Sequence, residues 1–393
     1  MVPDKVFHEA LTPSYIFDLG ALKARAAMLR ERLGARVHLV YAMKANPFLV
    51  EALVPCVDGF EVCSPGEERI CLRCGVPGEK MVLSGVNKEE ADVRDYVSHY
   101  GPAALYTVES PLQMERLNAE AERQKITLRV LLRLNAGNQF GMDAQTVRTL
   151  LEKRADYPAL SIFGLQYFSG TQKKLKRILE EIDELDDFLE ETGLEELEFG
   201  PGLPVSYFTE DKGPGEEALL SALVEKLQSM RFAGGITLEM GRFLAAPCGY
   251  YLTNIRDLKK GADASYCIVD GGIHQVNYYG QMMGMKHPFM RLMRAGQERP
   301  EPLTGEAEEG SEHWTVCGSL CTTADILLRD LPVKELQLSD TFLFEGAGAY
   351  AMTEGISLFL SRDLPRIYVY DDGQLKLVRD KIYTEEWNCG KTD

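Results

Sequence analysis

From about residue 20 to residue 240, the sequence repeats one pattern of a short apolar run, a turn and a longer amphipathic stretch. Strands that alternate with helices are joined by crossovers and run parallel, and eight of them predict a (β/α)8 barrel of the TIM type. A doubly wound sheet gives a similar alternation, so the periodicity alone leaves both architectures open. The predicted strands cover residues 36–42, 58–62, 80–83, 103–107, 128–134, 160–166, 195–199 and 235–239. Helices are predicted between them, for example at 64–74, 88–99, 110–124, 143–154, 174–190 and 215–229.

The predicted secondary-structure pattern changes after about residue 245, where few long helical stretches occur. We therefore expect a (β/α)8 barrel over residues 25–245 and a separate β-rich domain, a barrel or sandwich, from residues 1–24 and 246–393. Residues 296–312, rich in Gly, Glu and Pro, are predicted to form a mobile surface loop within it. The strand-like runs of this second region are 265–270, 313–317, 341–344, 366–370 and 374–378.

Charge and composition exclude several classes of protein. A net charge of −17 disfavours binding to a nucleic-acid backbone, which requires clustered Lys and Arg. No apolar stretch approaches the roughly 20 residues that span a bilayer, and the first residues lack the pattern of a secretory signal. We expect a cytoplasmic protein without a membrane segment. Nine scattered cysteines, with one isolated C-x-x-C at Cys71 and Cys74, predict neither a disulfide framework nor a metal site.

Residues suited to chemistry stand at the predicted strand ends, where barrel enzymes collect their active sites. Lys44 follows the first strand, and a lysine at the end of a buried strand must have a partner or stay neutral. A neutral amine is the form that Schiff-base chemistry requires. A lysine that simply emerges into solvent is the alternative.

Two later strand ends carry features that suit an anion and a ring nitrogen. Gly200 and Gly202 follow the seventh strand and allow backbone N–H groups to approach an anion. Glu239 and Arg242 end the eighth strand, three residues apart around Gly241. An ordinary turn and a structural ion pair are the alternatives, but the shared location of these features favours one common site.

Seven motifs in order resemble the ornithine/diaminopimelate decarboxylase family, which binds pyridoxal 5'-phosphate (PLP) in an alanine-racemase-like barrel. The resemblance covers nearly the whole chain. It implies that Lys44 forms the Schiff base with PLP, that Glu239 lies beside the pyridine nitrogen, and that Cys321 is catalytic. The matching segments are Tyr41–Asn46, Gly59–Glu67, Arg133–Asn135, Gly200–Tyr207, Glu239–Arg242, Cys317–Asp325 and Gly348–Tyr350.

The resemblance also implies an obligate homodimer, because the family's catalytic cysteine comes from the partner subunit. The phosphate of PLP is expected to be held by backbone N–H groups of the glycine-rich loop and by the side chains of Arg242 and Tyr350. The full set of implied cofactor contacts is Lys44, Phe168, Thr171, Gly200, Gly202, Glu239, Gly241, Arg242 and Tyr350.

The chain departs from the family pattern at four positions. Phe168 replaces the histidine that stacks on the cofactor ring; a phenyl ring can stack but cannot carry charge. Pro201 and Met240 replace a loop glycine and a proline. Thr322 stands where decarboxylases of basic amino acids and of diaminopimelate carry an acid that binds the distal end of the substrate. Asp325 remains available nearby, although the resemblance implies a mostly structural role for it.

These departures resemble a side branch of the family that includes enzymes acting on aminoacyl groups tethered to carrier proteins, as in butirosin-type pathways. Four basic residues after the sixth strand could meet an acyl or peptidyl carrier protein: Lys173, Lys174, Lys176 and Arg177. A solvated helix start is the alternative reading of this cluster.

We therefore expect a PLP-dependent decarboxylase that acts in a specialised biosynthetic pathway. Its substrate would be an amino acid or a carrier-tethered aminoacyl group, with Thr322, Asp325, Lys173 and Lys174 as candidate substrate or partner contacts. The alternatives are a PLP-dependent racemase and a decarboxylase of free ornithine or diaminopimelate. The β-rich domain favours decarboxylation over racemisation.

Overall fold

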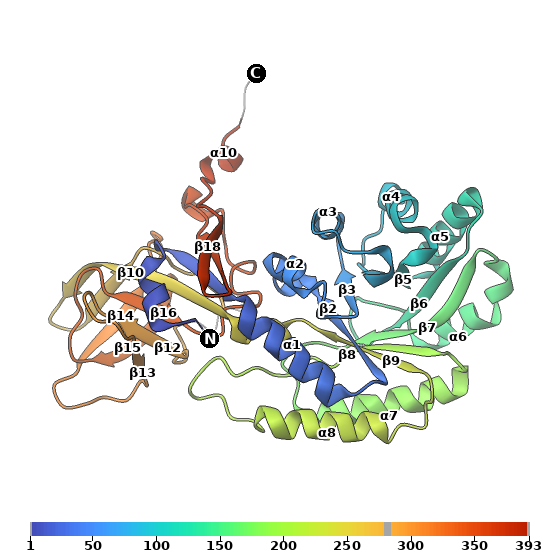
Figure 1. Cartoon of the computed structure of the whole chain (residues 1–393), viewed down its shortest axis with the longest axis horizontal. Coiled ribbons are helices and arrows are strands. Elements are labelled where there is room, and N and C mark those ends of the chain that lie inside the picture. The colour runs from blue at the N-terminus through green and yellow to red at the C-terminus, as the bar shows by residue number, and fades with distance from the viewer. Residues whose placement is uncertain (1, 279–283, 391–393) are drawn as a thin grey trace. The chain divides into compact units, whose positions relative to one another are not determined.

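The computed structural model describes residues 2–278 and 284–390 (Figure 1). The chain divides into two compact units. The barrel unit comprises Lys23–Pro204 and Pro214–Leu244, and the β-rich unit comprises the residues up to Leu22, Val205–Gly213 and the residues from Ala245 onward. Residues 205–213 fall inside the range predicted for the barrel, yet they pack with the β-rich unit. Phe208 pairs there with Pro288, and the side chain of Asp211 accepts from Lys286 at 2.7 Å.

Eight parallel strands close the barrel, which confirms the (β/α)8 prediction and excludes an open doubly wound sheet. The strands are mostly apolar and mostly buried, as expected for parallel strands covered by helices. The strands are β2 (Val37–Ala42), β3 (Gly59–Val62), β4 (Met81–Leu83), β5 (Leu105–Val108), β6 (Leu128–Leu134), β7 (Leu160–Phe168), β8 (Glu196–Gly200) and β9 (Gly235–Met240).

Several helices of the barrel start at a residue whose side chain caps the first turn. Ser64 and Ser110 each accept a hydrogen bond from a backbone N–H of the first turn, and a proline occupies the first position of both helices. Asp143 caps a third helix in the same way. The helices are α1 (Leu19–Leu33), α2 (Val50–Leu53), α3 (Pro65–Arg73), α4 (Glu90–Tyr100), α5 (Pro111–Gln124), α6 (Ala144–Glu152), α7 (Leu175–Thr192), α8 (Glu216–Gln228) and α9 (Arg242–Ala245).

The strands also carry charged and amide side chains at fully buried positions. Arg133 on β6 is in register with Gln166 on β7, which is in register with Glu198 on β8. Glu61 lies near the end of β3 and Glu239 near the end of β9, and both are buried. Buried polar groups of this kind require partners, so this layer is where a site is to be sought.

The β-rich unit is built on a long strand, β10 (Gly249–Lys260), that pairs with β1, β11 and β16. The strand order is β13-β12-β16-β10-β1-β17-β18, and β11, β14 and β15 continue from β10 on a second path. Phe7, Ile16, Leu252 and Leu343 belong to its hydrophobic core. The remaining strands are β1 (Ser14–Asp18), β11 (Ser265–Val269), β12 (Met290–Met293), β13 (Glu301–Leu303), β14 (Glu312–Cys317), β15 (Ile326–Val333), β16 (Thr341–Phe344), β17 (Arg366–Asp371) and β18 (Gln374–Arg379). A short helix, α10 (Glu385–Asn388), follows.

The segment 296–312 is not wholly a loop. Glu301–Leu303 forms the short edge strand β13, which pairs antiparallel with β12. Its side chains are largely exposed, so the sequence lacks the alternation of apolar and polar residues that predicts a strand. The prediction of a loop is therefore wrong for these three residues and for Glu312, which begins β14. Among all described residues, no helix is both long and apolar enough to cross a membrane.

Candidate active site

Lys44 lies in a 3-10 turn, Met43–Ala45, immediately after β2. Its Nζ atom is 2.7 Å from Glu61 Oε2 and 3.7 Å from Cys63 Sγ, and it stands 5.7 Å from the centre of the Phe168 ring. About one third of the lysine side chain is exposed, whereas that of Glu61 is buried. Although burial raises the pKa of Glu61, the charge and hydrogen bond of Lys44 bring that pKa below its ordinary value. Lys44 is thus a partnered ammonium at the mouth of the barrel.

Glu61 also organises the turn after β3. Its Oε1 atom is 3.3 Å from Cys63 Sγ, and the backbone N–H of Cys63 donates to Glu67 Oε2 at 2.7 Å. Burial and the neighbouring charge of Glu61 raise the pKa of the Cys63 thiol well above its ordinary value. The sequence analysis placed Glu61 in a matching motif but assigned it no role. The signal was available, because Glu61 lies near the end of β3, the neighbour of the strand that Lys44 follows.

A second set of buried charges stands at the ends of β4, β5 and β6. Lys88 Nζ donates to the backbone oxygen of Gly85 at 2.7 Å and to Gln113 Oε1 at 3.2 Å. Burial lowers the pKa of Lys88 to about 8. Arg133 pairs with Glu109 at 2.8 Å, which leaves both charges compensated. The sequence analysis did not single out Lys88 or Glu109.

Glu239 shares its end of the barrel with two groups that the sequence analysis missed. Gln166 Nε2 donates to Glu239 Oε1 at 2.9 Å. Burial and the Glu61 charge raise the pKa of Glu239. Burial and the charge of Glu239 raise the pKa of Glu198 well above its ordinary value. Glu239 is thus a buried acidic group with an amide and a second carboxyl group beside it.

The glycine-rich turn after β8 and the turn after β7 pack tightly against each other. Gly202 has a φ of +61°, and a Cβ atom there would lie 2.0 Å from the Gly170 backbone oxygen. No other residue fits this position without moving the backbone. The guanidinium of Arg242, 6% exposed, donates from Nε to Thr171 Oγ1 at 3.4 Å. A buried guanidinium, a hydroxyl and a close backbone turn form a cradle suited to a phosphate.

Lys173 does not lie on the surface with the other basic residues. Its side chain is 10% exposed and forms an ion pair with Glu181, and its Nζ atom is 2.7 Å from Ser169 Oγ. Arg177 pairs with the same Glu181 at 3.2 Å, and Lys176 with Glu180 at 3.7 Å. The expectation that Lys173 contacts a partner protein is therefore corrected, because its charge is buried and already neutralised. Lys174 remains exposed.

The β-rich unit holds the remaining predicted residues. Cys321 is exposed, and Thr322 Oγ1 accepts a hydrogen bond from the Ala324 N–H at 3.3 Å. Asp325 is buried, and its carboxylate accepts from the N–H groups of Ile273 at 2.8 Å and Leu320 at 2.7 Å. The expectation that Asp325 is available to a substrate is therefore corrected: it fixes the fold of the 318–325 loop.

Tyr350, the other predicted residue of this unit, has a φ of +62°. Its backbone oxygen accepts from the N–H groups of Thr353 at 2.9 Å and Glu354 at 3.0 Å. A tyrosine in the left-handed region carries a backbone cost that the surrounding structure must offset, and such positions cluster at functional sites.

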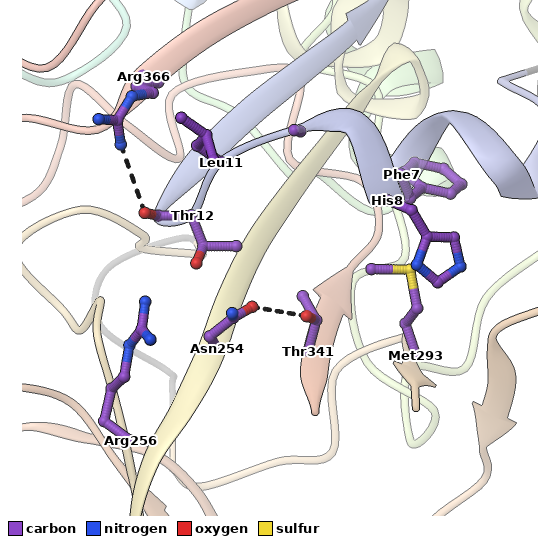
Figure 2. A pocket seen from close by; sticks show the side chains of 10 residues that line it. Phe7, His8, Leu11, Thr12, Asn254, Arg256, Met293, Thr341 and Arg366 are labelled. Atoms are coloured by element: carbon purple, nitrogen blue, oxygen red, sulfur yellow. Dashed lines mark hydrogen bonds between the residues drawn. The ribbon is translucent and has the colours of Figure 1, made fainter. Parts of the chain in front are cut away.

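A separate hollow of about 460 Å³ lies in the β-rich unit (Figure 2). Figure 2 shows Arg366 directed at the backbone oxygen of Thr12, and the side chains of Asn254 and Thr341 directed at each other at 2.6 Å. Its arginines are paired, Arg256 with Asp270 at 2.7 Å and Arg366 with Asp380 at 2.9 Å. None of the predicted site residues lines it, so we assign it no part in the chemistry.

Comparison with known families gives a match over more than half of the chain. The sequence model described as "Pyridoxal-dependent decarboxylase, pyridoxal binding domain" matches residues 19–246. This range contains the barrel strands, Lys44, the glycine-rich turn, Glu239 and Arg242.

Individual relatives match along nearly their whole length. The chain is 25% identical to the diaminopimelate decarboxylase of Aquifex aeolicus, over 94% of this chain and 89% of that protein. It is 25% identical to the L-glutamyl-[BtrI acyl-carrier protein] decarboxylase of Niallia circulans, over 94% and 91%. It is 27% identical to the 2-[(L-alanin-3-ylcarbamoyl)methyl]-2-hydroxybutanedioate decarboxylase of Staphylococcus aureus, over 91% and 93%.

A solved structure shows the same fold over both units. The crystal structure of diaminopimelate decarboxylase from Helicobacter pylori complexed with L-lysine superposes with a TM-score of 0.82 at 21% identity. The match covers 98% of this chain and 98% of that one.

Proposed function

Because the chain belongs to the ornithine/diaminopimelate family of pyridoxal-dependent decarboxylases, we propose that its substrate is an amino acid whose distal end is acidic or uncharged. The reaction releases the α-carboxylate as CO2. Bound PLP supplies an electron-withdrawing ring that takes up the electron pair left by the departing CO2. Racemisation is not favoured, since the family and the relatives above are decarboxylases.

The barrel residues fit this cofactor. The cradle formed by Gly202, Thr171 and Arg242 suits the phosphate, because no Cβ could occupy the position of Gly202 and the guanidinium is buried. Lys44 supplies the amine for covalent attachment, and Glu61 holds its ammonium until that bond forms. Glu239 is the anion that can face the ring nitrogen, and Phe168 offers an apolar face beside Lys44.

The observation that carries the choice of substrate is the charge of the 317–325 loop. Thr322 has no charge, and the Asp325 carboxylate is buried under two backbone N–H groups. The neighbouring charge is positive, since Arg362 Nη2 donates to the Ser319 backbone oxygen at 2.6 Å. In this loop, the distal ammonium of a substrate would have no accessible carboxylate to bind. A distal carboxylate or its acyl derivative could instead bind the guanidinium of Arg362.

The loop is proposed to act on the active site of a second copy of the chain. Cys321 is exposed, and a group of large apolar side chains in the same unit is also exposed, as at a surface that another protein covers. The described group comprises Ile356, Leu358, Phe359, Leu360, Tyr383 and Trp387, each at least 39% exposed. The segment that carries them is tied to the loop through Arg362 and Ser319.

Measurement of CO2 release from a substrate panel tests the proposal. The panel contains free lysine, ornithine, diaminopimelate and glutamate, and a glutamyl group on a carrier protein. We expect turnover of an acidic or carrier-bound member. Diamino acids should be weaker by roughly ten- to hundredfold, because a charge-assisted hydrogen bond is missing. Arg362→Gln should raise KM for the preferred substrate, with Arg329→Gln, another exposed arginine of this unit, as the matched control.

Lys44→Ala is the negative control for the whole panel and should release no CO2. Efficient turnover of a free diamino acid that Arg362→Gln leaves unchanged would contradict the proposed substrate. Loss of optical rotation without CO2 would contradict decarboxylation itself.

A further inference from the structure

Glu198 on β8 lies deep in the barrel with 1% of its surface exposed. Neither of its carboxyl oxygens receives a hydrogen bond from any donor in the described part of the chain. A carboxylate that has left water without gaining donors is strongly disfavoured. Glu198 must therefore be stabilised in its protonated state, as a donor to an acceptor nearby.

Glu239 is that acceptor. The charge of Glu239 is among the causes that raise the pKa of Glu198, so the two carboxyl groups are close neighbours. Gln166 Nε2 donates to Glu239 Oε1 at 2.9 Å, and Gln166 stands in register beside Glu198 on the adjacent strand. Two donors, one from β7 and one from β8, therefore converge on a single carboxylate of β9.

The charges around the pair favour one proton between the two acids. Glu61 on β3 and Glu196, two residues earlier on β8, add negative charge, and Lys44 at the end of β2 adds positive charge. Burial and the proximity of Glu239 raise the pKa of Glu198 well above its ordinary value. A second negative charge at this depth would meet Glu61 and Glu196 as well as Glu239.

We propose that Glu198 is a positioning residue that keeps a proton and donates it as a hydrogen bond to Glu239, so that the two acids carry one negative charge. The inference rests on the proposed place of Glu239 beside the ring nitrogen of PLP. Donation from Glu198 and Gln166 keeps the charge on Glu239 and fixes the direction of its carboxylate. A ring nitrogen that faces this charge stays protonated to higher pH.

Infrared spectroscopy of the cofactor-loaded protein tests the proton directly and does not depend on turnover. The difference between wild type and Glu198→Gln should contain the C=O band of a protonated carboxylic acid at neutral pH, and labelling with 13C-glutamate should shift that band. Glu196→Gln, on the same strand, is the matched control and should leave the Glu198 band in place. Absence of a protonated band for Glu198 would overturn the proposal, even if the protein decarboxylates its substrate normally.

Two variants of Glu198 test the role of the hydrogen bond. Glu198→Gln keeps a donor and should bind PLP as wild type does. Glu198→Leu removes the donor and should weaken PLP binding about tenfold or more. In Glu198→Leu, the pH at which the 15N resonance of the bound ring nitrogen titrates should fall. Equal behaviour of the Gln and Leu variants in both measurements would show that Glu198 only fills space; if Glu198→Leu does not fold, the infrared result decides.

Discussion

Lys44, Glu61 and Cys63 control one another's ionisation at the mouth of the barrel. The ammonium of Lys44 holds the pKa of Glu61 below its ordinary value despite burial. Burial and the Glu61 charge hold the pKa of Cys63 high, which keeps the thiol protonated and weakly nucleophilic. Of these three side chains, Lys44 is therefore the one suited to form a covalent bond.

His274 in the β-rich unit provides a prediction about pH at the residue scale. It is 1% exposed, its Nδ1 atom has no hydrogen-bond partner among the described residues, and burial lowers its pKa to about 4. Unfolded chains take up a proton on histidine near pH 6.5, so the folded state binds fewer protons between pH 6.5 and 4. Stability should fall as the pH falls through that window, by about 3 kcal/mol from this residue.

Denaturant unfolding at a series of pH values measures this loss. His274→Gln should remove about 3 kcal/mol of the acid-side decline, whichever way it changes stability at neutral pH. His8→Gln, at an exposed histidine of the same unit, is the control. Parallel pH curves for wild type and His274→Gln would contradict the assignment.

The role of a single residue could be predicted where its type and its place in the sequence are unusual. It could not be predicted where the role depends on which residue lies beside it in the folded barrel. Lys44, Glu239 and Arg242 stand out in the sequence because charge is unusual at the end of an apolar run. Glu61 and Glu198 do not, because their importance depends on which strands are neighbours and in which register. Ala42 pairs with Glu61, and Gln166 with Glu198, only once the barrel has closed.

At the scale of elements, an ion pair and hydrogen bonds hold the link between β7 and α7 in place. The ammonium of Lys173 and the carboxylate of Glu181 form an ion pair that is sealed from solvent, and Ser169 Oγ donates to the same carboxylate at 2.5 Å. The backbone N–H of Lys173 donates to the Gly202 oxygen at 3.0 Å. These contacts therefore connect α7 to both turns of the phosphate cradle.

Removing one partner of the Lys173–Glu181 ion pair should lower the free energy of unfolding. Glu181→Gln leaves a buried ammonium without its anion and should reduce the free energy of unfolding by about 3–5 kcal/mol. The double variant with Lys173→Met should lose less than the sum of the single variants, because no uncompensated charge remains. Urea unfolding gives these values, and the dissociation constant of PLP should rise in Glu181→Gln. Lys174→Met, at an exposed neighbour, is the control; additive losses would argue against a coupled pair.

Elements of the barrel were easier to predict than those of the β-rich unit. A buried parallel strand such as β6 is dominated by Leu and Val, and a cap such as Ser110 followed by proline indicates a helix start. In the β-rich unit, β15 contains Asp330 at a φ of +56° opposite a register shift in β14, which destroys the two-residue period. The outer half of β10 is polar and exposed, so it does not read as a strand.

At the scale of the whole molecule, the proposed homodimer places two essential groups of one site on two chains. Lys44 belongs to the barrel unit and Cys321 to the exposed loop of the β-rich unit. If the loop acts in the partner's site, each active site depends on both copies. A shared site of this kind can be tested by complementation, because two different lesions need not fall in the same site.

Mixed dimers of Lys44→Ala and Cys321→Ala provide that test. Each variant alone should have little activity. Subunit exchange should restore roughly a quarter of wild-type CO2 release, because about half of randomly mixed dimers are hybrids and each holds one intact site of two. Native mass spectrometry of a mixture in which one variant carries an affinity tag measures the exchange. Activity that stays at the level of the single variants after exchange would mean that Lys44 and Cys321 of the same chain work together.

The strand order of the β-rich unit has a consequence for synthesis on the ribosome. Ser14 of β1 pairs with Leu252 of β10 on one side and with Arg366 of β17 on the other. The pairing of β1 with β17 must therefore wait until about 350 more residues have been translated, roughly twenty seconds to a minute at about 5–20 residues per second. The barrel strands are all translated during this wait. A newborn chain thus carries a folded barrel and an unpaired apolar β1, a state in which a chaperone or a neighbouring nascent chain can bind that strand first.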